Sequence, residues 1–524
     1  MEDDRDTIWA YILKNIYKPL FFKDRFDFII GNPPWISFRY LEPAYQEKMK
    51  TRIIREYRLL SGRGELITHL EIGTLFLLRS ADLYLKPGGL IAFVLPRSLF
   101  TADQHHDLRL GTFKFSPDIK YKLYWRELWD CDKVFPLFNV PACVLWGEKL
   151  SAAEKSRESF PGLILEGKLP RKNASLEEAE KSLIFTETEF SLHRRGRRTF
   201  WAPGPGTMTK EASPYKKKFF QGATIVPRSF WFVRIKPSPL GFDPNMPPIE
   251  TDPRAIKEAK KPYQEVKFSG NVESRFLYAT LLSTDLLPFG HLDYRLVVLP
   301  LEPKGRKMQL LTIKTATEKG FSKLSEWLKK AEDKWKELRK EKADLMTIYD
   351  RIDRYHGLIR QSPKTKYRVI YNTSGTLLAA AVIKSQEIKF EINGQEIEAE
   401  NYLVDHVTYS LDSSVLNEAN YICSILNTSI IDKLVKPLQA RGLWGPRHIH
   451  KKVLEIPIPL FEETNPQHLS LASLGRNCTE KVSAWLAAGG PGQVKSIGRL
   501  RQIVRQLLKE ELQEIDALVV QILK

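Results

Sequence analysis

The sequence predicts an α/β fold in the first part of the chain, followed by a larger α+β domain. Two apolar segments, residues 26–30 and 90–95, each stop at glycine or proline, and a helical pattern lies between them. Apolar runs bounded in this way are typical of buried strands, because proline cannot donate a hydrogen bond within a sheet. Strand, helix and strand in this order are the elements of a parallel sheet.

The predicted elements follow one another in a simple order. They are a helix over residues 7–22, a strand over 26–30, a helix over 65–85, a turn at 86–89, a strand over 90–95, a helix over 102–110 and strands over 121–128 and 142–147. This pattern ends near residue 150, which predicts a first domain over residues 1–150. Its sheet is partial, because it has too few strands for a doubly wound Rossmann-like domain.

The amino-acid composition of the sequence changes after residue 150. Residues 151–460 mix basic, aromatic and proline-rich segments, which predicts a second, α+β domain. Within it, one charged stretch over residues 320–351 carries apolar residues at helical spacing and predicts a single long amphipathic helix. Residues 461–524 are expected to be a helical C-terminal segment, ending in a helix over 493–523.

Composition favours a folded protein with a polyanionic partner. Of the 524 residues, 43% are hydrophobic, and 81 Lys and Arg stand against 63 Asp and Glu, for a net charge of +18. Such a balance favours nucleic acid or an anionic membrane surface. The most apolar stretch contains Glu71, Arg79 and Asp82, so it predicts a core helix rather than a membrane span. The acidic N-terminus does not resemble a secretory signal, and we therefore expect a cytoplasmic protein without a membrane partner.

The four cysteines are far apart and form no C-x-x-C pair. Neither a disulfide framework nor a zinc site is indicated, so buried free thiols and no metal are expected.

Cations alternate with aromatic residues in two segments, 193–201 and 215–237. On a DNA-binding surface, cations bind phosphates while aromatic rings stack on bases or support the fold. The candidate DNA contacts here are Arg194, Arg195, Arg197, Arg198 and Arg228. For each single residue the alternative is a solvated face above a core strand.

The residues Asn32, Pro33, Pro34 and Trp35, called the NPPW corner below, follow the first strand directly. They are therefore expected at the carboxyl edge of the sheet, where ligands of open α/β folds bind. The Asn32 side chain and the Pro33 backbone offer two carbonyl acceptors, and an exposed Trp35 offers a face for a planar base. Two acceptors on one exocyclic amine favour a more tetrahedral nitrogen, whose lone pair can attack a methyl group. The corner suits amine methylation without an acidic base or a metal.

Residues 26–35 resemble motif IV of the amino-methylating DNA methyltransferases, and the asparagine form points to N6 of adenine. Residues 75–100 are similar to the helix, turn and strand that follow this motif in the gamma-type enzymes, and residues 133–145 resemble their motif VIII. The resemblance implies S-adenosylmethionine as cofactor and a flipped adenine held by Asn32, Pro33, Pro34 and Trp35. It also implies an aromatic residue on the other face of the base, which matches Phe135, with Phe138 as the alternative.

Residues 418–459 resemble the end of the target-recognition domain in large restriction-modification methyltransferases. The resemblance implies double-stranded DNA as partner. Candidate contacts in this segment are Arg441, Arg447, His448, His450, Lys451 and Lys452, with a solvated basic loop as the alternative.

The glycine loop that holds S-adenosylmethionine in such enzymes has no counterpart in the sequence. Segments 61–65 and 86–89 contain glycines, but both follow the NPPW corner and lack the preceding strand and acidic partner. We therefore expect the C-terminal portion of such an enzyme, which binds the cofactor weakly or not at all by itself and needs a partner polypeptide or parent chain that carries the loop. A truncated reading frame or a DNA-binding remnant are the alternatives. No convincing endonuclease signature occurs.

The leading hypothesis from the sequence is a site-specific DNA adenine N6-methyltransferase of a restriction-modification or phage-defence system, which acts by base flipping. The alternatives are a non-catalytic DNA-binding specificity module, and methylation of an amine on protein or RNA.

Overall fold

The structure is a computed structural model of the chain. It describes residues 10–13, 17, 20–115, 120–155, 157–206, 208–209, 212–239, 241–339, 345–439, 441–442, 445–446, 448–490, 492, 494 and 496–523. The chain divides into two compact units. Unit 1 comprises Met1–Ala212 and Val435–Arg447, and unit 2 comprises Ser213–Leu434 and His448–Lys524. No described helix is long and apolar enough to cross a membrane.

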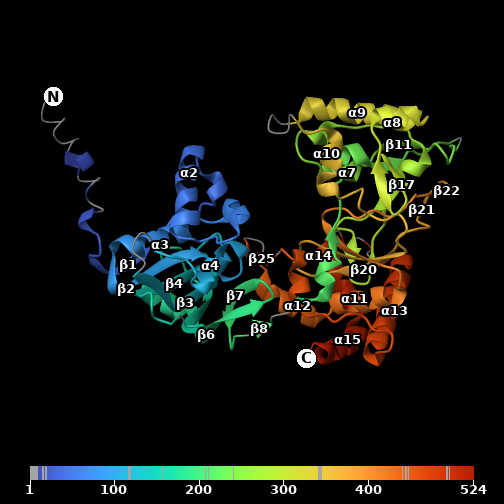
Figure 1. The fold of residues 1–524 in the computed structure, drawn as a ribbon. Helices are drawn as coiled ribbons and strands as arrows, with labels where there is room; N and C mark the ends of the chain where they lie inside the picture. Colours follow the sequence, from blue (N-terminus) through green and yellow to red (C-terminus); the bar gives the residue numbers. More distant parts are fainter. Residues whose placement is uncertain are drawn as a thin grey trace. The chain divides into compact units, whose positions relative to one another are not determined.

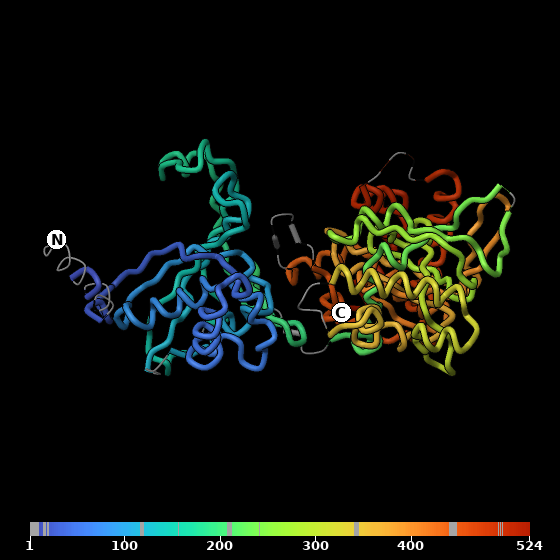
Figure 2. The backbone as a smooth tube through the Cα atoms, turned by 90° about the horizontal axis from the view of Figure 1, so that it is seen from above, coloured from blue at the N-terminus to red at the C-terminus, as the bar shows by residue number. Residues whose placement is uncertain are grey.

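Unit 1 is built on a mixed sheet of eight strands with the order β1-β2-β4-β3-β5-β6-β7, and β8 pairs with β6 (Figure 1). The strands are β1 (Phe26–Gly31), β2 (Leu85–Pro96), β3 (Tyr121–Phe135), β4 (Ala142–Ser151), β5 (Ser159–Lys168), β6 (Leu183–Arg195), β7 (Arg198–Pro203) and β8 (Met208–Thr209). Its helices are α2 (Pro43–Thr51), α3 (Gly73–Tyr84), α4 (His106–Leu110) and α5 (Leu176–Ser182). Figure 2 shows the C-terminal end of β5 and the N-terminal end of β6 projecting from the rest of unit 1.

The α/β fold class is confirmed, but the sheet is not parallel throughout. β1 pairs with β2 in parallel, as predicted, whereas β4 runs antiparallel to both β2 and β3. The predicted domain boundary at residue 150 falls inside unit 1, because β5, β6 and β7 extend the same sheet. Residues 435–447 also return to unit 1 from the predicted second domain.

The first strand departs from the expectation of a fully buried strand. β1 lies at the edge of the sheet, and Phe28 and Ile30 on one of its faces are 69% and 81% exposed. Ile29 on the opposite face packs against the core. At the end of the strand, Gly31 lies opposite Phe93, whose ring would be only 2.7 Å from a Cβ atom at residue 31. Only glycine fits there without a shift of the phenylalanine ring.

Unit 2 contains two larger sheets, with the orders β12-β11-β10-β16-β13 and β20-β19-β23-β9. Their strands are β9 (Phe220–Gln221), β10 (Phe232–Ile235), β11 (Pro248–Thr251), β12 (Ser269–Asn271), β13 (Leu277–Thr280), β16 (Arg295–Val298), β19 (Tyr367–Asn372), β20 (Ala380–Lys384) and β23 (Thr408–Ser413). Two-stranded pairs are β14 (Leu286–Leu287) with β15 (Gly290–His291), β17 (Leu301–Lys304) with β18 (Lys307–Leu310), and β21 (Lys389–Ile392) with β22 (Gln395–Glu398). A further pair, β24 (Arg441–Gly442) with β25 (Gly445–Pro446), lies in unit 1.

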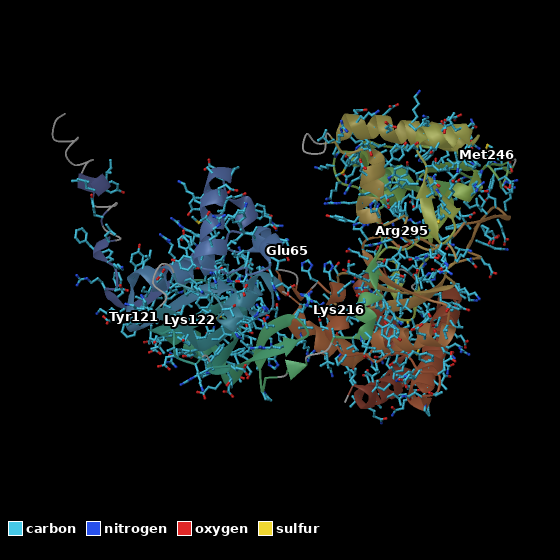
Figure 3. All side chains as sticks on the ribbon, viewed as in Figure 1. Glu65, Tyr121, Lys122, Lys216, Met246 and Arg295 are labelled. Atoms are coloured by element: carbon cyan, nitrogen blue, oxygen red, sulfur yellow. The ribbon has the colours of Figure 1, made fainter. Side chains whose placement is uncertain are left out.

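Helices cover these sheets and account for the α+β character of unit 2. They are α6 (Arg228–Trp231), α7 (Pro253–Glu258), α8 (Ile313–Glu318), α9 (Ser322–Leu338), α10 (Ile348–Ile352), α11 (Leu416–Asn427), α12 (Ser429–Val435), α13 (Pro466–Ala487), α14 (Ile497–Leu507) and α15 (Lys509–Ile522). Arg295 on β16, labelled in Figure 3, forms a buried ion pair with Asp285 at 2.7 Å.

Two helix predictions for this part are wrong in length. The stretch 320–351 is not one helix, because α9 ends at Leu338 and α10 follows as a separate helix. The Trp335 indole donates to the Met346 carbonyl at 2.8 Å, which fixes the chain where it turns back. The predicted C-terminal helix is divided into α14 and α15 at Leu508. The four cysteines are buried free thiols, as expected.

Candidate functional site

The NPPW corner continues from β1 as an irregular segment at the carboxyl end of the strand. Asn32 and Pro34 are exposed, Pro33 is buried and Trp35 is half-buried. The Trp35 indole N–H donates to the carbonyl of Val94 on β2 at 3.1 Å. This hydrogen bond fixes the indole against β2, three residues along the chain from the exposed Asn32.

The segment before α3 forms backbone hydrogen bonds with the residues that follow the NPPW corner. Ile72 donates its backbone N–H to Ile36 at 3.0 Å, and Phe38 donates to Leu70 at 2.9 Å. Gly73 allows close approach, since a Cβ atom there would lie 3.3 Å from Pro33 Cγ and 3.4 Å from the Pro34 carbonyl oxygen. The two prolines are therefore packed against the start of the helix.

A carboxylate network lies behind this contact, and sequence reasoning missed it. Glu71 accepts hydrogen bonds from His105 Nε2 at 2.9 Å, from Ser98 Oγ at 2.9 Å and from Gln104 Nε2 at 3.3 Å. Burial alone would raise the pKa of Glu71, but the positive charge of His105 and these hydrogen bonds outweigh it and lower the pKa to about 2. Glu71 also forms a backbone bridge with Ser37, which ties the network to the corner.

This network predicts a loss of stability in acid. The pKa of Glu71 lies at about 2 in the folded chain against an ordinary value of 4.5. The ionised carboxylate therefore contributes stability that is present above pH 4.5 and is lost as the pH falls to about 2. The contribution is on the order of 3 kcal/mol. We expect Glu71→Gln to flatten the pH dependence of the unfolding free energy in this window, measured by denaturant titration. Glu65→Gln, an exposed change nearby, should leave it unaltered.

The aromatic neighbour of Trp35 is Phe138. Their ring centroids are 5.2 Å apart and the planes are inclined by 44°, so the two rings are in direct contact. Phe135, the residue predicted to stack on the base, lies at the end of β3 with 59% of its surface exposed. The structure therefore places Phe138, the alternative residue, in contact with Trp35 of the NPPW corner. Phe135, three residues earlier in the chain, has an exposed ring.

A buried ion pair joins Arg97, which follows β2 directly, to Asp130 within β3. Arg97 donates to Asp130 at 2.8 and 2.7 Å, and its backbone N–H donates to Pro141 at 2.8 Å. The Arg97 guanidinium also lies 4.6 Å from the centre of the Phe100 ring. Arg97 therefore ties the end of β2 both to β3 and to Pro141, the last residue of the loop between β3 and β4 that carries Phe138.

Four predicted DNA contacts come together at one turn, but in unit 1 rather than in the second domain. Arg194 and Arg195 end β6, and Arg198 begins β7. Arg194 lies 3.6 Å from Glu158, Arg198 binds Asp103 at 2.6 Å, and Arg197 is exposed. The Arg195 guanidinium lies over the Phe200 ring at 5.8 Å.

The other predicted contacts are scattered. Arg228 is 15% exposed and binds Glu258 at 2.7 Å in unit 2, and Lys452 is buried, so neither offers a free cation to DNA. Lys451 donates to the carbonyl of Lys216, labelled in Figure 3, at 3.3 Å.

The remaining contacts belong to the same segment. His448 stacks on His450 with centroids 5.8 Å apart. Arg441 lies in β24, and Arg447 lies outside the described residues.

Comparison with known proteins supports the resemblance of the first segment. Residues 2–130 match the family described as Eco57I restriction-modification methylase. This match confirms the similarity to restriction-modification methylases that the NPPW corner and its surroundings indicate. No curated protein sequence matches the chain.

One solved structure shows a similar fold, and a second was matched at a lower score. The Type IIL restriction-modification enzyme MmeI, solved in complex with DNA, is 12% identical with a TM-score of 0.50, and the match covers 94% of this chain and 54% of that chain. The chain thus spans about half the length of that enzyme. The ATP-dependent Type ISP restriction-modification enzyme LlaBIII, solved bound to DNA, is 10% identical with a TM-score of 0.38 over 86% of this chain and 30% of that chain.

Proposed function

We propose that the chain is the catalytic and target-recognition portion of a site-specific DNA adenine N6-methyltransferase, acting in the cytoplasm as part of a restriction-modification or phage-defence system. The observation that carries the proposal is the NPPW corner, where an exposed Asn32 and a fixed Trp35 lie together at the end of β1. The match of residues 2–130 to a restriction-modification methylase family supports it.

The proposed role of the corner is to bind and orient one adenine. The Asn32 side-chain carbonyl and the Pro33 backbone carbonyl accept the two hydrogens of the exocyclic amine, and the adenine ring lies against Trp35. Acceptors on both hydrogens favour a more tetrahedral nitrogen and direct its lone pair away from the ring. The base must leave the helix to reach this position, so base flipping is part of the proposal.

The residues of this chain do not by themselves fit S-adenosylmethionine. The sequence has no glycine loop, and the flank of β1 away from β2 pairs with no strand among the described residues. Phe28 and Ile30 are exposed on one face of β1, where a further helix would cover them. When bound, the cofactor supplies the methyl group.

We therefore propose that a further polypeptide carries the glycine loop and completes the sheet at β1. It is either a separate chain or part of a longer one. The test supplies labelled S-adenosylmethionine and mixed-sequence duplex DNA to this chain alone and with the polypeptide encoded directly upstream. Label transfer that needs both polypeptides supports the proposal.

Two other outcomes would contradict the proposed enzyme. Salt-sensitive DNA binding without transfer in any combination leaves a DNA-binding specificity module. Transfer to protein or RNA but not to DNA assigns a different amine as substrate.

A further inference from the structure

A basic segment, residues 36–63, follows the NPPW corner directly and continues into α2. We infer that this segment binds backbone phosphates of duplex DNA beside the target base. The inference rests on the proposed function and names a DNA contact outside the residues discussed above.

The charge of the segment is strongly one-sided. It contains three glutamates against seven cations, which are Arg39, Lys48, Lys50, Arg52, Arg55, Arg58 and Arg63. Two of the cations are paired locally, Lys50 with Glu47 at 3.6 Å and Arg52 with Glu56 at 4.0 Å.

Four of the cations are available to a partner. Arg39, Lys48, Arg55 and Arg58 are exposed, and none forms an ion pair with a residue that the structure describes. A cation without a carboxylate neighbour is able to replace the counterions of a phosphate, which drives binding to DNA.

Exposed aromatic and apolar side chains accompany these cations. Tyr40 is 72% exposed, Ile36 46% and Tyr45 41%. The Arg39 guanidinium lies over the Tyr40 ring at 4.9 Å. Rings beside cations suit a surface that meets sugars and bases as well as phosphates.

The segment is rigidly mounted next to the corner. Its buried residues Phe38, Met49, Ile53 and Tyr57 belong to the core of unit 1, and the Tyr57 hydroxyl donates to Asp82 at 2.8 Å. Figure 1 shows α2 standing out from the sheet of unit 1. The segment is thus anchored in the core, projects from the sheet and carries cations next to the NPPW corner. It is positioned to contact the DNA strand that contains the target base.

The segment is continuous with the turn between β6 and β7. The Arg63 guanidinium donates to the Arg197 carbonyl at 3.1 Å. Burial first, and then the positive charges of Arg63, Arg109 and Arg194, lower the pKa of the nearby His106 to about 4. The two elements are therefore in contact at Arg63 and Arg197, close to further arginines.

The test measures binding of the full chain to a non-specific duplex without cofactor, as a function of salt. The variant Arg39→Gln/Lys48→Gln/Arg55→Gln removes three unpaired exposed cations. We expect the slope of log K against log salt to become shallower by about 2 to 3, and the affinity to fall about tenfold or more. The matched control Arg39→Lys/Lys48→Arg/Arg55→Lys keeps the charge and should bind like the unaltered chain.

Each other outcome overturns the inference in a recognisable way. An unchanged slope in the glutamine variant removes this segment from the DNA surface and leaves the proposed function standing. Equal weakening in the charge-retaining control shows that charge is not the cause. If only binding to anionic phosphatidylserine vesicles is lost, the partner is a membrane. If the unaltered chain binds no duplex even at low salt, the proposed function fails as well.

Discussion

Replacing Asn32 with alanine is expected to reduce methyl transfer by about 100- to 1000-fold, the cost of removing one well-placed hydrogen-bonding group from a reaction centre. Asn32 is exposed and lies outside the sheet, and Trp35 is fixed independently by its hydrogen bond to Val94. The fold and the DNA affinity should therefore be unchanged. The measurement is single-turnover transfer from labelled S-adenosylmethionine to duplex DNA, with the completing polypeptide present.

Two comparison variants sharpen this expectation. Asn32→Asp keeps an acceptor oxygen at the same position and should retain more activity than Asn32→Ala, because only the acceptor is required. Asn173→Ala makes the same truncation at an exposed site of unit 1 and should have no effect. An Asn32→Ala chain that transfers methyl groups at a rate within threefold of the unaltered one would remove Asn32 from the reaction.

Replacing Asp130 with alanine is expected to destabilise unit 1 by about 3 kcal/mol or more, since it leaves Arg97 buried without its main partner. The side chains of Arg97 and Asp130 are only 16% and 10% exposed. Asp132 lies 3.9 Å from the guanidinium and offsets part of the loss. Because Arg97 also holds the loop that carries Phe138, methyl transfer should fall together with stability.

The measurement is denaturant-dependent hydrogen exchange of peptides from β3 and β4. Lys133→Ala provides the matched control on the same strand, because it breaks the pair with Glu166, whose members are 59% and 38% exposed. Such a surface pair contributes at most about 1 kcal/mol. A loss below about 1 kcal/mol for Asp130→Ala would show that the buried pair does not hold these strands together.

What could be predicted from the sequence depended on short-range chemistry. Gly31, Pro33 and Pro34 end a strand wherever they occur together, so the NPPW corner and its place on β1 followed from adjacent residues. The helix and strand after it were found for the same reason, although α3 begins only at Gly73 and the predicted turn at residues 86–89 belongs to β2. The parallel pairing of β1 with β2 then followed from their order.

What was missed depends on contacts between distant residues. Glu71 meets Ser98 and His105, and Arg97 meets Asp130, across separations of 27 to 34 residues that no local pattern encodes. Phe135 and Phe138 are equivalent as aromatic residues near a proline, and only the packing of the loop against Trp35 distinguishes them.

The domain boundary failed for a related reason. Strands such as β5, β6 and β7 have the same sequence pattern whether they extend one sheet or begin another. The alternation of apolar and polar residues indicates which face of a strand is buried, but it does not identify the partner strand. The turn residues Arg194 to Arg198 were recognised as a basic group but placed in the wrong domain on that account.

The most direct test of the central claim is the identity of the methylated base. DNA treated with this chain, its completing polypeptide and labelled S-adenosylmethionine is digested to nucleosides and separated by chromatography with mass detection. The NPPW corner predicts label in N6-methyladenine, and its absence with Asn32→Ala. Label in N4-methylcytosine, or N6-methyladenine that persists in Asn32→Ala, would contradict the account.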